Sequence, residues 1–265
     1  MARIKNGMLS GSLGELTFTY DEYGPIVKEK SKVDKKRIKN SPSSKGTREG
    51  NMEMGGASMA AKDLRLVFML KKNNLGDQYF SGRLSGRMRK LVLLGGGLSG
   101  QRKLDIRKNG SLLEGFEFIN ARPLVYAVGG IKKKPSFNKE RNEVRWSSPT
   151  LDRKEQITAP EEATHFTFKF GAATVSNYEY SAIHKKYWPL ERKFKNLNVF
   201  TESDPLALKQ KTIAPVKLSI KLTDGIAIPE DVAVVTVIGI SFYKNINGEL
   251  LEVSNTGGMK ILGVE

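Results

Sequence analysis

The chain has 265 residues, of which 39% are hydrophobic, and a formal net charge of +16 at pH 7. It contains no cysteine, which excludes disulfides, thiolate metal ligands and cysteine nucleophiles. Residues 1–150 hold 30 of the 44 Lys and Arg and 14 of the 28 Asp and Glu, so the excess positive charge lies entirely in this half. We expect one part of the protein to face an anionic partner while the neutral part packs independently.

The beginning of the chain, MARIKNGMLSGSLGELTF, has no apolar run of the length found in secretory signals. No other stretch reaches the length needed to span a bilayer. We therefore expect no signal peptide and no membrane span, and a protein of the cytoplasm or of an assembled particle.

The first structural signal is a hairpin followed by a basic arm. Two β-favouring runs, 15–20 and 25–30, flank a turn that contains Asp21 and Gly24. Residues 28–45 are rich in Lys and Arg and poor in apolar side chains, which predicts a flexible arm without a core of its own. The arm supplies the first candidate contacts for an anion or a partner: Lys35, Lys36, Arg37 and Lys39.

Two helices are expected next. Apolar residues recur at helical spacing over residues 49–70 and again over 78–94, where the triple glycine 95–97 ends the pattern. The second helix carries a basic stripe of Arg83, Arg87 and Lys90 beside its apolar stripe. Short strands are predicted at 103–107, 112–119 and 124–128.

A domain boundary is predicted near residue 138, because residues 131–142 are charged, contain a proline and break the apolar pattern. Residues 1–138 then form a basic, glycine-rich α+β domain. The remainder, 139–265, is predicted to be all β, with strands at 165–170, 215–222, 232–243, 249–253 and 259–264. About seven strands over this length favour an immunoglobulin-like β-sandwich, so the whole is assigned to the α+β class.

Several segments of the first 120 residues are similar to known sequences. They are the start MARIKNGMLSGSLGELTF, the segment NSPSSKGTREGNMEMGGASMAAKDLR at 40–65, GRLSGRMRK at 82–90 and LLEGFEFI at 112–119. These segments resemble a group of uncharacterised proteins from Bacteroidota. The resemblance implies a glycine-rich start and helices before a β-rich C-terminal half, and it implies no catalytic residues.

The sequence argues against an enzyme. The loop Gly95 to Gly100 has the glycine spacing of a phosphate-binding loop, but Gln101 and Arg102 follow where that motif needs Lys and then Ser or Thr. His165 and His184 have no recognisable Ser, Cys or Asp partner. We expect no enzymatic activity, no cofactor and no metal site.

The remaining hypotheses are assembly and nucleic-acid binding. Arg102 and Lys103 join the arm and the helix stripe as candidate contacts for an anion or a partner. The aromatic stretch Tyr178, Tyr180, Tyr187 and Trp188 is a candidate protein interface, with ordinary packing between sheets as the alternative. The main hypothesis is a subunit of a larger particle or filament whose partners are copies of itself or other subunits. The alternative is a nucleic-acid-binding protein that contacts backbone phosphates without sequence preference.

Overall fold

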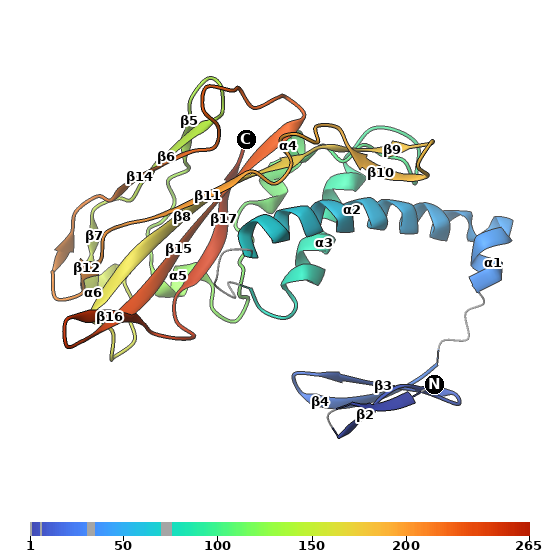
Figure 1. Ribbon diagram of the computed structural model, residues 1–265, viewed down its shortest axis with the longest axis horizontal. Coiled ribbons are helices and arrows are strands. Elements are labelled where there is room, and N and C mark those ends of the chain that lie inside the picture. Colours follow the sequence, from blue (N-terminus) through green and yellow to red (C-terminus); the bar gives the residue numbers. More distant parts are fainter. Residues whose placement is uncertain (1, 6, 31–34, 70–75) are drawn as a thin grey trace. The chain divides into compact units, whose positions relative to one another are not determined.

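A computed structural model describes residues 2–5, 7–30, 35–69 and 76–265 of the chain (Figure 1). It divides into two compact units, 1–48 and 49–265, each of which is described by itself. The fold is mixed α and β, with a few helices and many antiparallel strands, in agreement with the predicted class. Within the described ranges, no helix combines the length and the apolar character that crossing a membrane requires.

The first unit is built on a four-stranded antiparallel sheet. Its strands β1 (Ala2–Lys5), β2 (Met8–Leu13), β3 (Leu16–Asp21) and β4 (Gly24–Glu29) pair in sequence order. Two-residue turns connect β2 to β3 and β3 to β4, and glycines with positive φ lie directly before β2, at Gly7, and in the turn before β3, at Gly14. The predicted hairpin at 15–30 is confirmed as β3 and β4.

The predicted arm at 28–45 has more regular structure than its composition suggested. It contains the end of β4, helix α1 (Lys35–Asn40) and the 3₁₀ turn η1 (Pro42–Ser44), while residues 31–34 lie outside the described residues. The Arg48 guanidinium donates hydrogen bonds to the carbonyl oxygens of Ile38 at 2.9 Å and Ser41 at 2.7 Å. These bonds satisfy backbone carbonyls around the end of α1, which a composition argument cannot foresee.

Both predicted helices are confirmed. Helix α2 (Lys45–Met69) and helix α3 (Phe80–Leu93) bury residues spaced three and four apart, as the apolar pattern requires. In α2 the buried apolar side chains are Ala57, Ala60, Ala61, Leu64, Val67 and Phe68, and in α3 they are Phe80, Leu84, Met88, Leu91 and Val92. These side chains form a core together with one face of the largest sheet.

The largest sheet is organised around two long central strands, β8 (His165–Ser176) and β15 (Val232–Ile246), which pair along twelve residues. The neighbouring strands are β11 (Asn198–Glu202), β12 (Leu206–Ala207), β16 (Glu249–Glu252) and β17 (Gly258–Val264). Small side chains such as Ala173 and Ala233 face the helices, whereas Phe166, Phe168 and Phe170 face a second core. Successive strand residues point to opposite faces, so these two strands are shared by both cores.

The second core is closed by a three-stranded sheet in the order β14 (Lys217–Lys221), β6 (Glu143–Ser147), β5 (Ser136–Phe137). Trp146 of β6 lies with its ring centroid 5.5 Å from that of Phe168 and 6.1 Å from that of Phe170. Two small pairs complete the β structure: β7 (Leu151–Asp152) with β13 (Thr212–Ile213), and β9 (Tyr178–Ser181) with β10 (Lys186–Pro189).

The prediction of three short strands between residues 103 and 128 is wrong. The structure has instead α4 (Ile106–Asn109), the 3₁₀ turn η2 (Gly110–Leu113) and α5 (Leu124–Ala127), and a further short helix, α6 (Arg153–Gln156), follows later. Asp105 explains the first difference, because its carboxylate accepts a hydrogen bond from the Lys108 amide and caps α4.

The boundary predicted near residue 138 falls inside the second unit. Helices α2 and α3 share one core with strands β8, β15 and β17, so the helical and β-rich segments are packed together. An immunoglobulin-like arrangement of residues 139–265 is not confirmed, because the strands form one six-stranded and one three-stranded sheet with two short pairs beside them.

Candidate interaction surfaces

The N-terminal sheet has one apolar face. Residues that are directly opposite on antiparallel strands share a face, and the register pairs Ile4 with Leu9, Leu13 with Leu16, and Phe18 with Val27. With Tyr20, which alternates with Phe18, they make up what we call the apolar face: Ile4, Leu9, Leu13, Leu16, Phe18, Tyr20 and Val27. The opposite face carries mainly hydroxyl and basic side chains, among them Arg3, Ser10, Ser12, Thr17, Thr19 and Lys28.

This apolar face is open. Ile4 is 77%, Leu13 61% and Val27 54% exposed, and no residue described in the first unit is buried. A small sheet gains stability in water by packing its apolar face against another layer. The exposed apolar face is therefore the strongest candidate contact surface of the first unit.

The predicted basic contacts of the first unit lie on α1. Lys36, Arg37 and Lys39 are exposed on this short helix. Lys35 begins the helix, but its side chain lies outside the described residues. Three of the four predicted cations are thus placed close together on α1. This helix contains no acidic residue.

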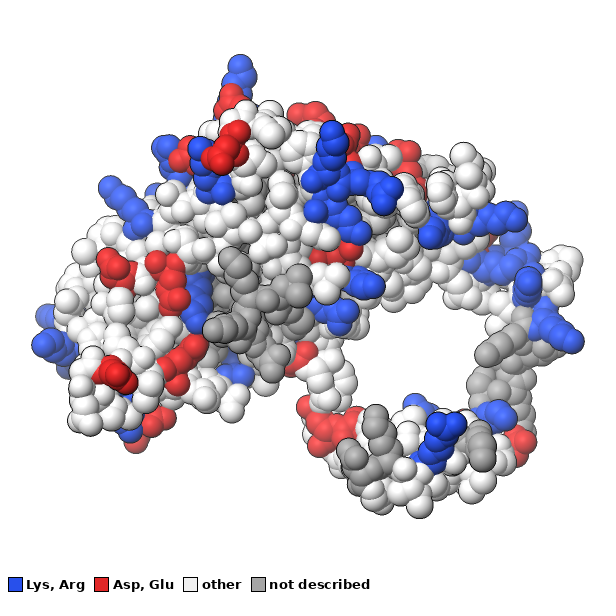
Figure 2. Space-filling view, in the orientation of Figure 1, with Lys and Arg blue, Asp and Glu red and all other residues white. Residues whose placement is uncertain are grey.

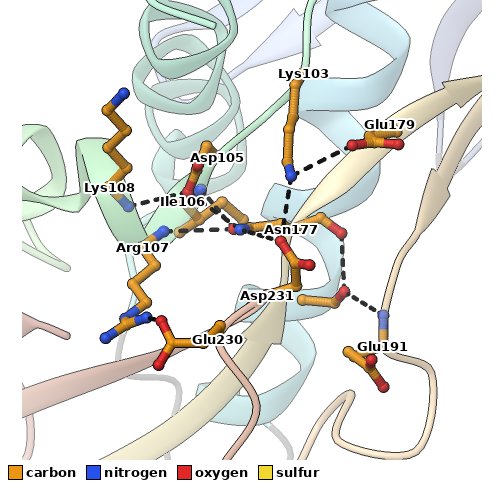
Figure 3. A network of polar contacts seen from close by, with 11 residues as sticks. Lys103, Asp105, Ile106, Arg107, Lys108, Asn177, Glu179, Glu191, Glu230 and Asp231 are labelled. Atoms are coloured by element: carbon orange, nitrogen blue, oxygen red, sulfur yellow. Dashed lines mark hydrogen bonds and ion pairs between the residues drawn. The ribbon is translucent and has the colours of Figure 1, made fainter.

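Arg102 and Lys103 are held by acidic residues of the fold. Glu53 is 1% exposed and forms ion pairs with Arg89 at 2.7 Å and Arg102 at 2.9 Å. Its carboxylate also accepts a hydrogen bond from the Gly100 amide at 2.8 Å. The Lys103 ammonium lies 3.2 Å from Asp231 and 3.3 Å from Glu179 (Figure 3). Basic and acidic side chains are also interspersed over the face of the second unit in Figure 2. Arg102 and Lys103 therefore stabilise the fold through these ion pairs.

The helix stripe lines a groove on α3. Arg83, Arg87 and Lys90 lie beside Phe116 and Asn120 around a cavity of about 350 Å³. Arg83 is fixed there, since its guanidinium lies 2.8 Å from Asp77, donates to the carbonyls of Glu117 and Phe118 and stacks 5.0 Å from the Phe116 ring. Arg87 donates to the Leu112 carbonyl at 3.2 Å, and Lys90 is exposed.

The electrostatics of Asp77 follow from these contacts. Burial raises the pKa of Asp77, but hydrogen bonds from the Asn120 amide and the Arg83 guanidinium outweigh burial, so the pKa lies below its usual value. The groove therefore retains Arg87 and Lys90 as its least neutralised cations, and Arg83 is mainly a packing and positioning residue.

The predicted aromatic interface separates into two parts. Tyr178 and Tyr187 are buried in the core: the Tyr178 hydroxyl donates to Asp63, and the Tyr187 hydroxyl donates to the Arg102 carbonyl at 2.8 Å. Burial raises the pKa of Tyr187 to about 12. The partly exposed members are Tyr180 and Trp188.

Trp188 lies in a basic environment on the β9–β10 hairpin. The ring of His184 stacks on it at 4.4 Å, and the cationic groups of Lys186 and Arg192 lie 5.0 and 5.2 Å from its centroid. Ile183, between the two strands of the hairpin, is 90% exposed. Trp188 and Tyr180 thus remain candidate contacts, whereas the packing alternative applies to Tyr178 and Tyr187.

Substitution of Gly56 tests the packing of Tyr187. A Cβ atom at Gly56 would lie 2.4 Å from Cγ of the Tyr187 ring, so α2 approaches the β9–β10 hairpin through this glycine. We expect Gly56→Val to lower the free energy of unfolding by about 2–4 kcal/mol, because the ring must leave a close-packed site. Gly55→Val, at a helical glycine with open space around it, is the matched control in thermal unfolding. Equal loss in both variants would contradict the packing role.

A buried asparagine that the sequence analysis did not identify organises the polar network of Figure 3. Asn177 is 2% exposed and directly follows β8. Its side-chain oxygen accepts from the Ile106 amide at 2.8 Å and the Arg107 amide at 3.4 Å. Its side-chain nitrogen donates to Asp105 at 3.1 Å and to Asp231 at 3.2 Å.

The chemistry of this network is structural. Asn177 links the start of α4 to the residue before β15, and Arg107 forms ion pairs with Glu230 and Glu265. Lys103 and Arg107 are paired with acidic residues, and every side-chain hydrogen-bonding position of Asn177 is used. Across the part of the chain that the structure describes, no three His, Cys, Asp or Glu side chains are grouped to hold a metal ion.

Comparisons with known proteins add no relative: the chain matches no family model, no curated protein and no solved structure.

Proposed function

We propose that the protein is a non-enzymatic assembly subunit, in which the apolar face of the N-terminal sheet packs against the same face of a second copy. The observation that supports this proposal is the apolar face itself, which has no covering layer within the first unit. Burying a side chain such as Ile, Leu, Val or Phe contributes about 1.5–3 kcal/mol. The apolar face therefore provides a substantial driving force for association.

The positive charge of the first unit does not prevent a second copy from covering the apolar face. Residues 1–48 contain eleven Lys and Arg against five Asp and Glu, so two such units repel one another at long range. No Lys or Arg belongs to the apolar face, however, and Arg3 and Lys28 lie on the opposite face. The register places one carboxylate, Glu29, opposite Leu16 at the edge of the apolar face. Two sheets can thus stack face to face at about 10 Å without burying a cation. A two-fold axis places the same patch on both copies, as in most soluble homo-oligomers.

Growth beyond a pair would use the sheet edges. The outer edges of β1 and β4 have no partner strand among the described residues. Unpaired backbone groups at a sheet edge form a template for a strand from another chain. The proposed pair is therefore a building block from which a particle or filament can extend.

The oligomeric state of a two-residue variant tests the proposal. Ile4→Thr with Val27→Thr keeps two β-favouring residues but makes the apolar face polar. Each substitution is expected to weaken association by about 1 kcal/mol, and a two-fold interface contains each site twice. The dissociation constant is then expected to rise roughly a thousandfold. Light scattering during size-exclusion chromatography should show an oligomer for the original chain and a monomer for this variant.

The matched control is Met8→Thr with Ile26→Thr, which changes two residues on the other face that are 47% and 36% exposed. This control is expected to elute as the original chain does. A monomeric original chain, or equal behaviour of the two variants, would contradict assembly through the apolar face. A monomer that gains mass only with DNA or RNA, in a salt-dependent manner, would support the nucleic-acid alternative instead.

A further inference from the structure

A second group of cations gathers on the outer face of the β14–β6–β5 sheet. The register places Lys217 opposite Ser147, and Ser219 and Ser136 on either side of Arg145. Directly opposed residues share a face, so these five side chains lie together, while Leu218, Trp146 and Val144 face the core. Lys133 joins them at the rim of a cavity of about 360 Å³. We call this group the sheet-face cluster: Lys133, Ser136, Arg145, Ser147, Lys217 and Ser219.

The position of Lys133 is fixed by its backbone. The Trp146 indole nitrogen donates to the Lys133 carbonyl at 3.1 Å, and the nearby side chain of Ile131 is buried in the second core. The Lys133 ammonium then donates to the Ser147 hydroxyl at 2.8 Å. A core residue therefore holds the segment that brings Lys133 to the sheet, which limits the entropy lost when a ligand binds there.

Neighbouring carboxylates pair with Arg145 and with Lys134 but leave the two lysines of the cluster unneutralised. Glu143 lies 2.8 Å from Arg145, and Glu114 lies 2.6 Å from Lys134 beside the cluster. Among the described residues, neither Lys133 nor Lys217 has a carboxylate within ion-pair distance. The Lys133 ammonium donates to Ser147, Lys217 lies directly opposite Ser147 in the register, and both lysines line the same cavity. Like charges that line one cavity repel one another unless an anion lies between them.

We propose that the sheet-face cluster binds a tetrahedral oxyanion, the phosphate or sulfate group of a ligand. The donors surround the cavity on three sides: Lys133 from its loop, Lys217 from β14 and the hydroxyl of Ser147 from β6. Ser219 adds a hydroxyl, and Arg145 adds a guanidinium whose Nε and Nη2 already bind Glu143. Several separate donors around one cavity suit a tetrahedral oxyanion, whose acceptor oxygens point to different sides, better than a carboxylate, whose two oxygens lie in one plane.

This site is independent of assembly through the N-terminal sheet, because every residue of the cluster belongs to the second unit. It also differs from the α3 groove, where Arg83 is already engaged by Asp77 and two carbonyl groups. The sheet-face cluster combines Lys133 and Arg145 of the basic half of the chain with Lys217 of the neutral half.

Calorimetric titration of the full chain with inorganic phosphate, inorganic sulfate and acetate tests the proposal. The three probes are compared at one ionic strength of about 0.1 M, where charges more than about 10 Å away are largely screened. The variant is Lys133→Gln with Lys217→Gln. The matched control is Lys139→Gln with Lys221→Gln, which removes the same charge from two exposed lysines outside the cavity.

Phosphate, sulfate or both are expected to bind the original chain and the control with a stoichiometry of one at the cluster, and acetate more weakly. The cluster variant is expected to lose about tenfold or more in affinity, because two charge-assisted donors are gone. Preference for one of the two tetrahedral anions would identify which group the natural ligand carries. Equal binding of acetate, or unchanged affinity in the cluster variant with an unchanged melting temperature, would overturn the proposal.

Discussion

A chain shortened to residues 49–265 is expected to melt at the same temperature as the second unit of the full protein, whereas residues 139–265 alone are expected not to fold. The reason is that β8, β15 and β17 contribute side chains to both cores. Without α2 and α3, the side of these strands that faces the helices would be exposed to water. Its larger side chains are Val175, Val235, Val237, Met259 and Ile261.

The burial free energy lost from these side chains is large enough to prevent folding of the fragment. Five large apolar side chains that lose their burial represent about 7–15 kcal/mol, which equals the whole free energy of unfolding of an ordinary domain. Circular dichroism and thermal unfolding of both fragments measure the effect. A cooperative transition in the fragment 139–265 would restore the domain boundary predicted from sequence and would contradict a shared core.

Replacement of Asn177 is expected to have the largest effect of any single substitution in the polar network. Asn177→Asp keeps the shape but replaces the donating nitrogen by an oxygen, which then faces the carboxylates of Asp105 and Asp231. Three acidic groups would meet in a buried place, so we expect a loss of about 3–5 kcal/mol at pH 7. Asn177→Ala leaves the Ile106 amide without its partner and is expected to cost about 2–3 kcal/mol.

The dependence of the free energy of unfolding on pH separates these two mechanisms. Burial and like charges raise the pKa of an introduced carboxyl group, and the protonated form is neutral. The deficit of Asn177→Asp relative to Asn177→Ala is therefore full above the raised folded-state pKa and shrinks as the pH falls through it. Chemical denaturation from pH 8 down to about pH 4 measures this difference. Asn51→Asp, at an exposed position on α2, is the control, and a deficit as large in that variant would exclude the proposed role.

The parts of the fold that sequence predicted are those with a long periodic pattern. Helices α2 and α3 and strands β8 and β15 have enough apolar repeats to identify them. A strand is predicted over residues 124–128, where Val125 and Tyr126 favour strands, but residues 124–127 form a single helical turn after Pro123. The N-terminal strands before residue 15 were not predicted, since glycine and serine interrupt the alternation in β2.

The candidate contacts were less predictable than the elements. The sequence predicts that Arg102 and Lys103 bind a partner because they belong to a basic cluster. Their acidic partners are distant in sequence: Glu53 lies 49 residues from Arg102, and Asp231 lies 128 residues from Lys103. Only the fold brings these pairs together. Tyr178 and Tyr187 alternate with exposed residues on a hairpin, and sequence could not reveal that α2 covers one side of it at Gly56. Sequence therefore could not show which candidate contacts are already engaged by residues that are distant in the chain.

The core shared by α2, α3 and β17 also sets an order for synthesis on the ribosome. The helices end at Leu93, but Met259 and Ile261, which complete their packing, are made only after the long segment between Leu93 and β17. At about 5–20 residues per second, the apolar stripes of the helices remain uncovered for on the order of 10–30 s until β17 is made. A nascent chain is thus exposed to chaperones while this segment is translated, and slower codons before β17 would lengthen that exposure.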